Sequence, residues 1–333
     1  MSISGVSVIM PIYNEVRAIE QSVASLLKQR MGDHPIEILA VDGMSTDGTT
    51  EKLAAMAAAD SRIRVVQNPD RTTPYALNVG LAQAEHDFVA VLGAHTDYDP
   101  DYLATCLAVV EGDGNIAGCS GRVIALPATS STISAVAHWV MSSRLGSSGK
   151  SFRTQQAGPA DSIPYPVFRR SILRDLGGYN TRLTRNQDND MNRRIIESGQ
   201  TLYCSWATTC TYKSPSSVRA LLRYAWRNGR WVAVSLRENP KAMRARHLAP
   251  ALFASGTIGG VAVALVAKSL PTPLRVFLGS APVAAHLAVG VAEVVGDIAK
   301  GGDRRIVFAP AGALGFHVAY GVGTLAGLVR PPG

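Results

Sequence analysis

Histidine and aspartate side chains cluster where one apolar run of the sequence ends. Residues 88–92 read Phe-Val-Ala-Val-Leu, and His95, Asp97 and Asp99 follow at alternate positions. In an open α/β sheet, a buried strand delivers polar side chains to the edge at which ligands and metal ions bind. This spacing therefore predicts a ligand-binding or metal-binding edge directly after the strand.

Three further motifs place polar or glycine residues where they can serve a ligand. They are Pro11-Ile12-Tyr13-Asn14-Glu15, Asp42-Gly43 with Asp47-Gly48, and Asn78 with Gly80. The first two motifs follow apolar runs, so that their side chains meet at one edge if these runs are parallel strands of one sheet. Plain turn chemistry is the alternative for the Asp-Gly pairs, because Asp and Gly are also the residues that turns favour.

Short apolar runs alternate with helical patterns over the first half of the chain. This alternation is typical of an α/β fold with a mostly parallel sheet and helices on both faces. Strands are predicted at 6–10, 36–41, 63–67, 88–92 and 116–125, and helices at 17–28, 49–59, 74–84, 101–111 and 188–198. A helical pattern at 130–149 is expected to end in a mobile loop at 146–149.

Taken together, the motifs resemble those of the inverting nucleotide-sugar glycosyltransferases of family two, which have a GT-A (Rossmann-like) fold. The resemblance covers residues 6–212. It implies a donor site formed by Pro11, Tyr13, Glu15, Asp42, Asp47 and Asn78. In that site the carboxylate of Asp42 accepts a hydrogen bond from the nucleotide base, usually uracil.

Family members usually end the fourth strand in Asp-x-Asp, whose acids hold a divalent metal on the donor diphosphate. Gly93 and His95 occupy these two positions here, a pattern similar to a subgroup of succinoglycan-type glucosyltransferases, which has His at the second position. We therefore expect His95 to bind the metal, with Asp97 replacing the missing acid. Mn²⁺ is favoured over Mg²⁺ because imidazole suits Mn²⁺ better. A polar group that caps the strand end is the alternative for His95.

The segment 186–194 is similar to the family motif that carries the catalytic base. An inverting transfer needs one general base to remove the proton of the acceptor hydroxyl. The resemblance assigns this role to Asp188, while Gln187 replaces a usual Glu on the acceptor side. Asp190 and Arg194, four residues apart, are expected to form a structural ion pair along the helix.

Two further segments resemble parts of the family's substrate sites. Gly178 and Tyr179 match an acceptor-side turn, for which a purely structural turn is the alternative. Lys213, Arg227 and Arg230 stand where related membrane synthases carry a Gln-x-x-Arg-Trp motif, which this chain lacks. Arginine side chains there are expected to meet a diphosphate through charge-assisted hydrogen bonds, and processive polymerisation is not supported.

The C-terminal part of the sequence has the pattern of a membrane attachment. Residues 216–238 form an amphipathic pattern with a stripe of Arg, which predicts a helix in the membrane interface beside anionic phospholipid. Apolar segments at 248–267, 274–295 and 306–329 are long enough to cross a bilayer. A packed surface helix and a soluble helical bundle are the respective alternatives. Basic residues flanking the segments predict a multi-pass plasma-membrane protein whose N-terminal domain is cytoplasmic.

Charge and cysteine usage exclude other classes of protein. The net charge is +8, and residues 213–247 alone contain nine Lys or Arg against one acid, so the basicity is local and a nucleic-acid partner is not expected. The four cysteines have no zinc-like spacing, which predicts reduced thiols in a cytoplasmic domain. The N-terminus leads directly into the first strand, with no signal-peptide pattern.

The sequence therefore predicts three regions, which are a GT-A domain at 1–212, a basic interface region at 213–247 and a transmembrane region at 248–333. The predicted activity is metal-dependent, inverting transfer of a sugar from a nucleotide sugar, a UDP-hexose by the family's usual preference, to a hydroxyl of a lipid-linked acceptor. Two alternatives stay open. One is a polyprenyl-phosphate glycosyl synthase, and the other is a non-catalytic membrane scaffold, which Gly93 and Gln187 suggest.

Overall fold

The computed structural model describes residues 4–147 and 151–332, and the chain divides into two compact units. The sheet unit contains Met1–Ile124 and Gln155–Tyr212, and the helical unit contains Ala125–Thr154 and Lys213–Gly333. Residues 125–154 therefore pack with the C-terminal helices, although they lie within the first 212 residues. The boundary at Tyr212 coincides with the end of the predicted GT-A domain.

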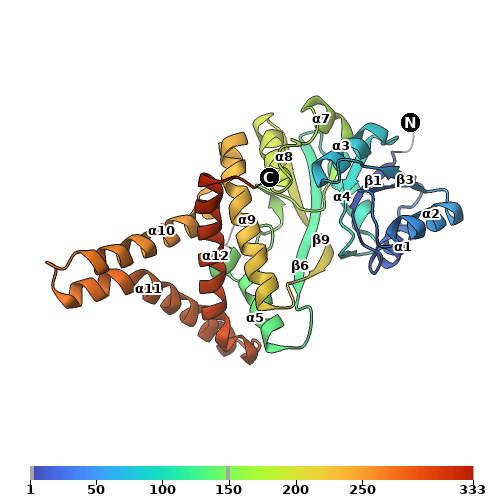
Figure 1. Cartoon of the computed structure of the whole chain (residues 1–333). Helices are drawn as coiled ribbons and strands as arrows, with labels where there is room; N and C mark the ends of the chain where they lie inside the picture. The colour runs from blue at the N-terminus through green and yellow to red at the C-terminus, as the bar shows by residue number, and fades with distance from the viewer. Residues whose placement is uncertain (1–3, 148–150, 333) are drawn as a thin grey trace. The chain divides into compact units, whose positions relative to one another are not determined.

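A nine-stranded mixed sheet forms the centre of the sheet unit (Figure 1). The strands are β1 (Val6–Ile12), β2 (Ile36–Asp42), β3 (Ile63–Gln67), β4 (Phe88–Val91), β5 (Thr96–Tyr98), β6 (Ile116–Leu126), β7 (Gly158–Pro159), β8 (Val167–Arg169) and β9 (Thr201–Lys213). Their order is β3-β2-β1-β4-β8-β6-β9-β5, with β7 paired to β9. Strands β1 to β4 are mutually parallel, and β6 shares their direction because β8 is antiparallel to both β4 and β6.

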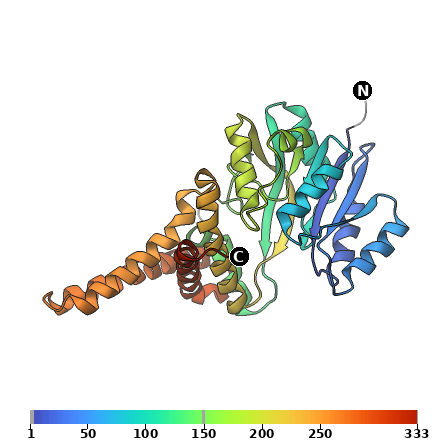
Figure 2. The same ribbon diagram turned by 45° about the horizontal axis from the view of Figure 1, so that its top comes forward.

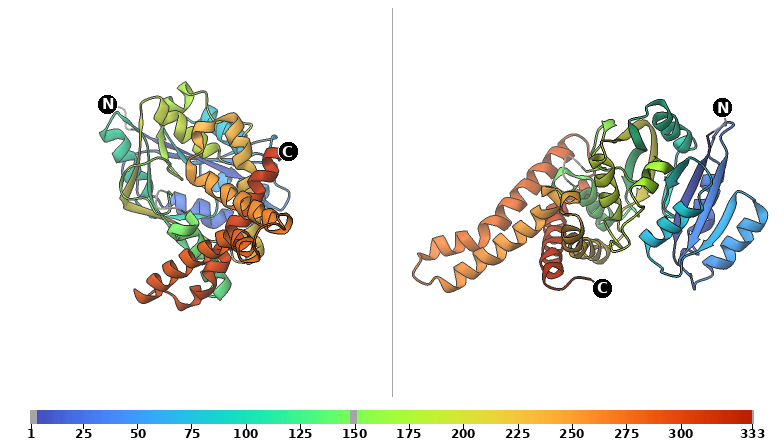
Figure 3. Two further views of the ribbon diagram at one scale, coloured as in Figure 1. Left: turned by 90° about the vertical axis from the view of Figure 1, so that its left-hand side faces the viewer. Right: turned by 90° about the horizontal axis from the view of Figure 1, so that it is seen from above.

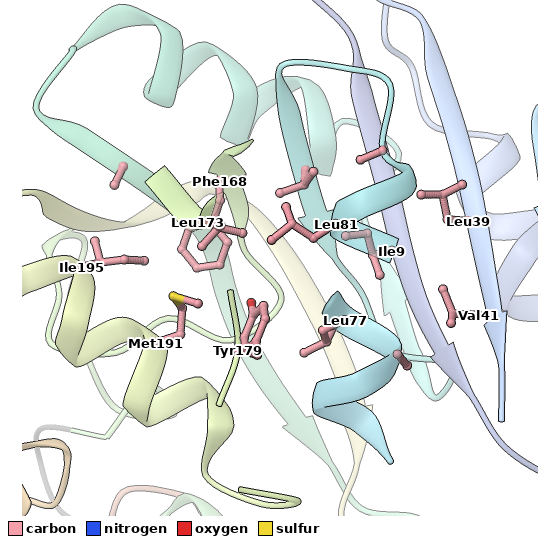
Figure 4. Packing of buried hydrophobic residues seen from close by; sticks show 14 of the residues in the cluster. Ile9, Leu39, Val41, Leu77, Leu81, Phe168, Leu173, Tyr179, Met191 and Ile195 are labelled. Atoms are coloured by element: carbon pink, nitrogen blue, oxygen red, sulfur yellow. The ribbon is translucent and has the colours of Figure 1, made fainter. Parts of the chain in front are cut away.

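Helices cover both faces of this sheet. They are α1 (Ile19–Leu27), α2 (Thr49–Ala59), α3 (Thr73–Gln83), α4 (Tyr102–Gly112), α7 (Arg170–Asp175) and α8 (Gln187–Glu197). Figures 2 and 4 show α3 against the sheet, where Leu77 and Leu81 pack near Ile9. On the same face, the ring of Tyr179 lies between α3 and Met191 of α8, and all of these side chains are buried.

The predicted α/β GT-A-like fold is confirmed, and all five predicted strands exist with ends shifted by at most two residues. Strand β9 was not predicted, because its Thr, Tyr, Trp and Cys residues do not form the aliphatic runs used to find the others. The loop predicted at Gly146 and Ser147 is wrong, since these residues end the short helix α6 (Arg144–Ser147). The rest of that predicted loop, residues 148–149, lies outside the described residues.

The predicted reduced state of the cysteines agrees with the structure. Cys106, Cys119, Cys204 and Cys210 are all free and buried in the sheet unit. Burial raises the pKa of the Cys210 thiol to about 12, which keeps it protonated and unreactive at neutral pH.

Helices make up most of the helical unit. They are α5 (Thr132–Ser142), the short α6, and the long helices α9 (Val218–Glu238), α10 (Ala245–Val266), α11 (Thr272–Ala299) and α12 (Ala309–Val329), with short 3₁₀ turns at Pro240–Ala242 and Arg304–Phe308. Helix α9 is the predicted amphipathic helix. Three segments, Ala245–Val266, Thr272–Ala299 and Arg304–Val329, are long and apolar enough to cross a membrane.

Glycine residues allow α9 and α12 to pack closely. A Cβ atom on Gly229 of α9 would lie 2.0 Å from the carbonyl oxygen of Tyr320, and one on Gly323 of α12 would lie 2.6 Å from that of Trp226. Contacts this short are far inside van der Waals distance. The two backbones therefore approach so closely that no side chain fits between them at these positions.

We expect Gly229→Ala to destabilise the chain by about 1–3 kcal/mol, the usual cost of overpacking a close contact. The midpoint of thermal unfolding of the detergent-solubilised full chain measures this effect. Gly256→Ala in α10 is the matched control, because a Cβ there meets nothing within 4 Å. Equal midpoints for the two variants would contradict the close packing of α9 on α12.

Candidate active site

Parallel strand order brings the polar motifs of the sheet unit to one edge. Ile12 at the end of β1 is in register with Asp42 at the end of β2, and Asp42 is in register with Gln67 of β3. Strand β4 lies on the other side of β1, so that the segment after it reaches the same edge. Residues 11–15, 42–49 and 93–97 therefore follow neighbouring strand ends.

Hydrogen bonds between the first two motifs hold this edge together. Asn14 adopts a left-handed conformation, with φ of 56°. Its backbone N–H donates to the Ser45 hydroxyl at 2.9 Å, and its side-chain oxygen accepts from the N–H of Thr46 at 2.9 Å. The N–H of Glu15 donates to the Thr49 hydroxyl at 2.8 Å. The loop after β1 is thus anchored on the loop after β2.

Asp47 has a structural set of partners within this pair of loops. The Thr49 hydroxyl donates to Oδ1 at 2.6 Å, and the N–H of Val16 donates to Oδ2 at 3.2 Å. Donation by the Thr49 hydroxyl lowers the pKa of the Asp47 carboxyl. The predicted donor-binding role of Asp47 stays a prediction.

Asp42 is buried, with 2% of its surface exposed, and both carboxylate oxygens accept hydrogen bonds from hydroxyl groups. Ser45 Oγ donates to Oδ1 and Thr50 Oγ1 donates to Oδ2, each at 2.6 Å. The backbone N–H of Ser45 also donates to the carboxylate, at 3.2 Å to Oδ1 and 3.4 Å to Oδ2. The sequence reasoning missed Ser45 and Thr50, although hydroxyl residues shortly after an Asp-Gly turn are the available signal.

Tyr13 is the exposed aromatic residue of this edge. Its side chain is 47% exposed, and its ring lies 3.3 Å from where a Cβ atom on Gly43 would be. Pro11 precedes it inside β1, in register with Val41 of β2. A glycine at position 43 thus lets the tyrosine ring lie close to the β2 backbone.

Glu15 and His95 form a direct pair between the segments that follow β1 and β4. Glu15 Oε1 lies 2.7 Å from His95 Nε2, with His95 68% exposed and Glu15 20% exposed. The sequence placed these residues in different parts of the site, one at the nucleotide and one at the metal. The structure brings them together because β1 and β4 are neighbours.

Near His95, Asp97 and Gly93 are held by contacts of their own backbone. Asp97 is exposed on the short strand β5, in register with Thr211 of β9. The N–H of Gly93 donates to the Tyr98 hydroxyl at 2.8 Å. Within residues 4–147 and 151–332, no three His, Cys, Asp or Glu side chains are grouped to hold a metal ion. Metal ligation by His95 and Asp97 stays a prediction.

Asn78 of α3 clamps the turn that carries Gly178 and Tyr179. Its Nδ2 donates to the Tyr179 carbonyl oxygen at 2.8 Å, and its Oδ1 accepts from the Tyr179 N–H at 2.7 Å. Gly178 has a φ of +74°, and a Cβ there would lie 2.6 Å from Asn78 Oδ1. Glycine is therefore required at position 178 for both conformation and space.

Arg194 of α8 holds the same turn from the other side. Its Nε pairs with Asp190 Oδ2 at 2.9 Å, which confirms the predicted ion pair, and the carboxylate of Asp190 is almost fully buried. Its terminal nitrogens donate to the carbonyl oxygens of Leu176 and Gly178, each at 2.8 Å. The family motif on α8 thus includes one residue pair that fixes the Gly-Gly-Tyr turn.

Asp188 lies in the first turn of α8 and is exposed. Its Oδ1 accepts from the N–H of Asn189 at 2.9 Å. Burial, and secondly the nearby Asp188 carboxylate, raise the pKa of Tyr179 well above its usual value. The side-chain oxygen of neighbouring Gln187 is buried and has no hydrogen-bond partner. The turn and the predicted base therefore adjoin one another.

We expect Asn78→Ala to lower the midpoint of thermal unfolding by about 4–8 °C, because about 2 kcal/mol is lost when two backbone groups of Tyr179 lose their partner. Scanning calorimetry of the full chain measures the change. Gln83→Ala on the same helix is the control, since Gln83 is exposed at its C-terminal end. An unchanged midpoint combined with weaker nucleotide binding would instead favour the donor-binding role predicted for Asn78.

The three basic residues predicted to meet a diphosphate belong to the helical unit. Lys213 at the end of β9 and Arg227 of α9 are both exposed. Arg230 donates to the carbonyl oxygen of Arg330 at 3.2 Å, beyond the C-terminal end of α12. Arg230 thereby stabilises a helix end, and the diphosphate contacts of all three stay predictions.

The sheet order, with polar residues gathered at the ends of β1, β2 and β4, defines the class of α/β domains with a GT-A-like sheet. A family model described as glycosyl transferase family 2 matches residues 7–177, just over half of the chain. The chain therefore belongs to glycosyl transferase family 2 and is a glycosyltransferase.

Individual relatives are similar in sequence, and a solved structure shares the fold. The chain is 25% identical to the succinoglycan biosynthesis protein ExoA of Rhizobium meliloti over 95% of its own length and 92% of that protein. It is 26% identical to a dolichyl N-acetyl-α-D-glucosaminyl phosphate 3-β-D-2,3-diacetamido-2,3-dideoxy-β-D-glucuronosyltransferase of Methanococcus voltae, over 66% of this chain and 70% of that one. The mannosyltransferase PcManGT of Pyrobaculum calidifontis, solved with GDP-Man and Mn²⁺, shares the fold with a TM-score of 0.58 at 19% identity, over 96% of this chain and 88% of that one.

Proposed function

We propose that this glycosyltransferase moves one sugar, with inversion, from a nucleotide sugar to a hydroxyl of a lipid-linked acceptor, in polysaccharide or glycolipid assembly. The observation that carries the proposal is the shared strand edge of the sheet unit. It gathers Asp42, Tyr13 and the Glu15–His95 pair at the ends of β1, β2 and β4. ExoA and the Methanococcus voltae transferase, by their names, also act in glycan assembly.

Donor binding is assigned to the first two strand ends. The exposed ring of Tyr13 offers a flat face for a nucleotide base, and Asp42 offers carboxylate oxygens that are oriented by Ser45 and Thr50. A carboxylate fixed in this way accepts the N–H of a pyrimidine without a further loss of side-chain conformational entropy. A UDP-sugar is the proposed donor on this ground and on the family's preference.

The donor set around His95 fits a divalent cation. Glu15 Oε1 and His95 Nε2 are 2.7 Å apart, a hydrogen-bond distance, so that a cation held by both atoms would replace this hydrogen bond, and Asp97 lies two residues further on. Mg²⁺ and Mn²⁺ sites in phosphate-transfer proteins commonly use only one or two side chains and complete the shell with phosphate and water. The cation, with Mn²⁺ favoured by imidazole, would neutralise the charge that develops on the leaving diphosphate.

Asp188 is the proposed general base. Its exposed carboxylate takes the proton of the acceptor hydroxyl while that oxygen attacks the anomeric carbon on the face opposite the diphosphate. The turn of Gly178 and Tyr179 is assigned to the acceptor side through its backbone, since the Tyr179 ring is buried in the core, and Gln187 is assigned to the same side. The Asn78 and Arg194 clamps hold this turn, so that the acceptor approaches a rigid surface.

Membrane attachment completes the proposal. The three long apolar helices are compatible with a plasma-membrane protein whose sheet unit is cytoplasmic, where nucleotide sugars are available. The basic residues of α9 complement anionic phospholipid. A lipid-linked acceptor would then share the membrane with the enzyme.

A screen of nucleotide sugars with purified full-length protein, lipid extract and either Mn²⁺ or EDTA tests this function. We expect release of nucleoside diphosphate that requires both Mn²⁺ and an extracted lipid whose acceptor group is a hydroxyl. Transfer only to polyprenyl monophosphate would identify the synthase instead. Absence of binding to every nucleotide sugar would favour a non-catalytic scaffold.

A further inference from the structure

We infer that only α10 and α11 cross the membrane, while α12 lies beside α9 in the interfacial layer on the side of the sheet unit. This inference rests on the membrane attachment proposed above and revises the expectation of three spans. It makes the surface formed by α9 and α12 the face that meets lipid headgroups.

Helix α12 follows α9 along its whole length. Near their N-terminal ends, a Cβ on Gly315 would lie 3.4 Å from Leu222, and further along a Cβ on Gly327 would lie 2.6 Å from the carbonyl oxygen of Arg230. At the C-terminal ends, Arg237 donates to the carbonyl oxygen of Leu328. The two helices are therefore parallel neighbours from end to end, as Figure 1 shows.

Helix α9 is a poor membrane span. It contains five arginines within 21 residues, at positions 219, 223, 227, 230 and 237, and the first three are exposed. Each arginine at the centre of a bilayer costs about 2.5–3.5 kcal/mol on insertion scales. Because α12 is packed against α9 over its full length, α12 takes the same orientation. If α9 lies in the interface, α12 lies there too.

Burial separates the third apolar segment from the other two. The most apolar stretch of Arg304–Val329 is 39% buried within the protein, whereas the corresponding stretches of α10 and α11 are each 11% buried. The residues of α12 that stay exposed are apolar ones such as Val318, Leu328 and Val329. An apolar outer face beside an arginine-bearing helix matches the division between acyl chains and headgroups at a bilayer surface.

Helices α10 and α11 form a hairpin that leaves α12 at a steep angle (Figures 1 and 3). The hairpin touches α12 near its base, where Gly321 meets the Pro250 carbonyl and His286 Nε2 is 2.7 Å from His317 Nδ1. From Pro250 to Val266, helix α10 extends about 24 Å at 1.5 Å per residue, close to the hydrocarbon thickness of a bilayer, about 30 Å. The surface of the hairpin is apolar, with Leu265 of α10 and Val276 and Phe277 of α11 exposed.

Charge at the two ends of the hairpin indicates the same topology. Lys241 and Arg244 precede α10, Arg246 lies in its first turn, and Lys300, Arg304 and Arg305 follow α11. A hairpin places both clusters on one side of the membrane, which is the side that positive charge favours. At the other end of the hairpin, the turn carries Lys268 and the first turn of α11 carries Arg275. A third span would instead place the C-terminus opposite the sheet unit.

Labelling with a membrane-impermeant maleimide tests this topology in the full chain. The four native cysteines are buried, so that the unmodified protein supplies the blank. Single cysteines are introduced as Gly114→Cys in an open loop of the sheet unit, Lys268→Cys in the hairpin turn and Pro331→Cys after α12. We expect Pro331→Cys to react from the same side as Gly114→Cys, and Lys268→Cys to react only from the other side.

Two results would overturn the inference while leaving membrane attachment intact. Reaction of Pro331→Cys from the same side as Lys268→Cys would show that α12 crosses the bilayer. Reaction of Lys268→Cys from the same side as Gly114→Cys would show that the hairpin does not cross. Release of the whole protein from membranes by carbonate would contradict the attachment in the proposed function, and the topology with it.

Discussion

Asp188→Asn is expected to lower kcat for sugar transfer to a hydroxyl acceptor by about 10²- to 10⁴-fold, the range that a general base contributes. The amide cannot accept the proton that the acceptor hydroxyl loses. The substitution keeps the size of the side chain, and Asn189 N–H retains an oxygen acceptor at this position. Initial rates with the native lipid acceptor, together with nucleotide binding by calorimetry, measure the two effects separately.

Asp175→Asn is the matched control for this experiment. Asp175 is an exposed carboxylate at the end of α7, in the same unit, and it takes no part in the proposed site. We expect its rate to equal that of the unmodified enzyme and the nucleotide affinity of both variants to stay the same. Near-normal turnover by Asp188→Asn would remove Asp188 from the role of base and would favour a monophosphate acceptor, which has no proton to lose.

His95→Ala is expected to reduce kcat/KM by about 10²-fold or more, since loss of a metal that neutralises a leaving diphosphate removes several kcal/mol of transition-state stabilisation. Binding of the free nucleoside is expected to change little, because Tyr13 directly follows β1 and Asp42 ends β2, whereas His95 lies in the segment after β4. Titration of Mn²⁺ against activity, and of uridine against the Mn²⁺-free protein, separates these readouts. EDTA is expected to reduce the unmodified enzyme to the level of the variant.

Gly93→Asp provides a gain-of-function counterpart. A Cβ atom at this position meets Tyr165 at 3.4 Å, which is ordinary contact, so that the backbone accepts a side chain. The new carboxylate restores the acid that the family usually has here, and we expect activity at lower Mn²⁺ concentration.

Unchanged metal dependence in His95→Ala would contradict the metal role of His95 and would leave it as a polar group that caps the strand end beside Glu15.

Local pattern was sufficient to predict most of the sheet unit. Apolar runs between turn residues identified β1, β2, β3, β4 and β6, because buried parallel strands are continuous aliphatic segments. Strand β9 has no continuous aliphatic run, so that its sequence did not predict a strand, and its burial depends on its neighbours in the sheet. The ion pair of Asp190 with Arg194 was predictable because four-residue spacing on a helix places the two side chains together.

Contacts between segments that are distant along the chain could not be predicted from the sequence. Nothing in the spacing of Glu15 and His95 predicts their 2.7 Å contact, which exists because β4 returns to pair with β1. Asn78 was assigned to the donor through its motif, yet its hydrogen bonds go to Tyr179, 101 residues further along the chain. Both cases arise from strand order, a property that no local window contains.

The sequence by itself determined the family, the strand ends that carry polar groups and the long apolar segments near the C-terminus, because these depend on residue type and short spacing. Only the tertiary structure decided which groups meet at the strand edge and which apolar helix has a protein neighbour. Composition makes α12 equivalent to α10 and α11, whereas its glycine contacts place it against the arginine-bearing helix α9. Hydropathy records how apolar a segment is, and packing determines whether protein or lipid covers it.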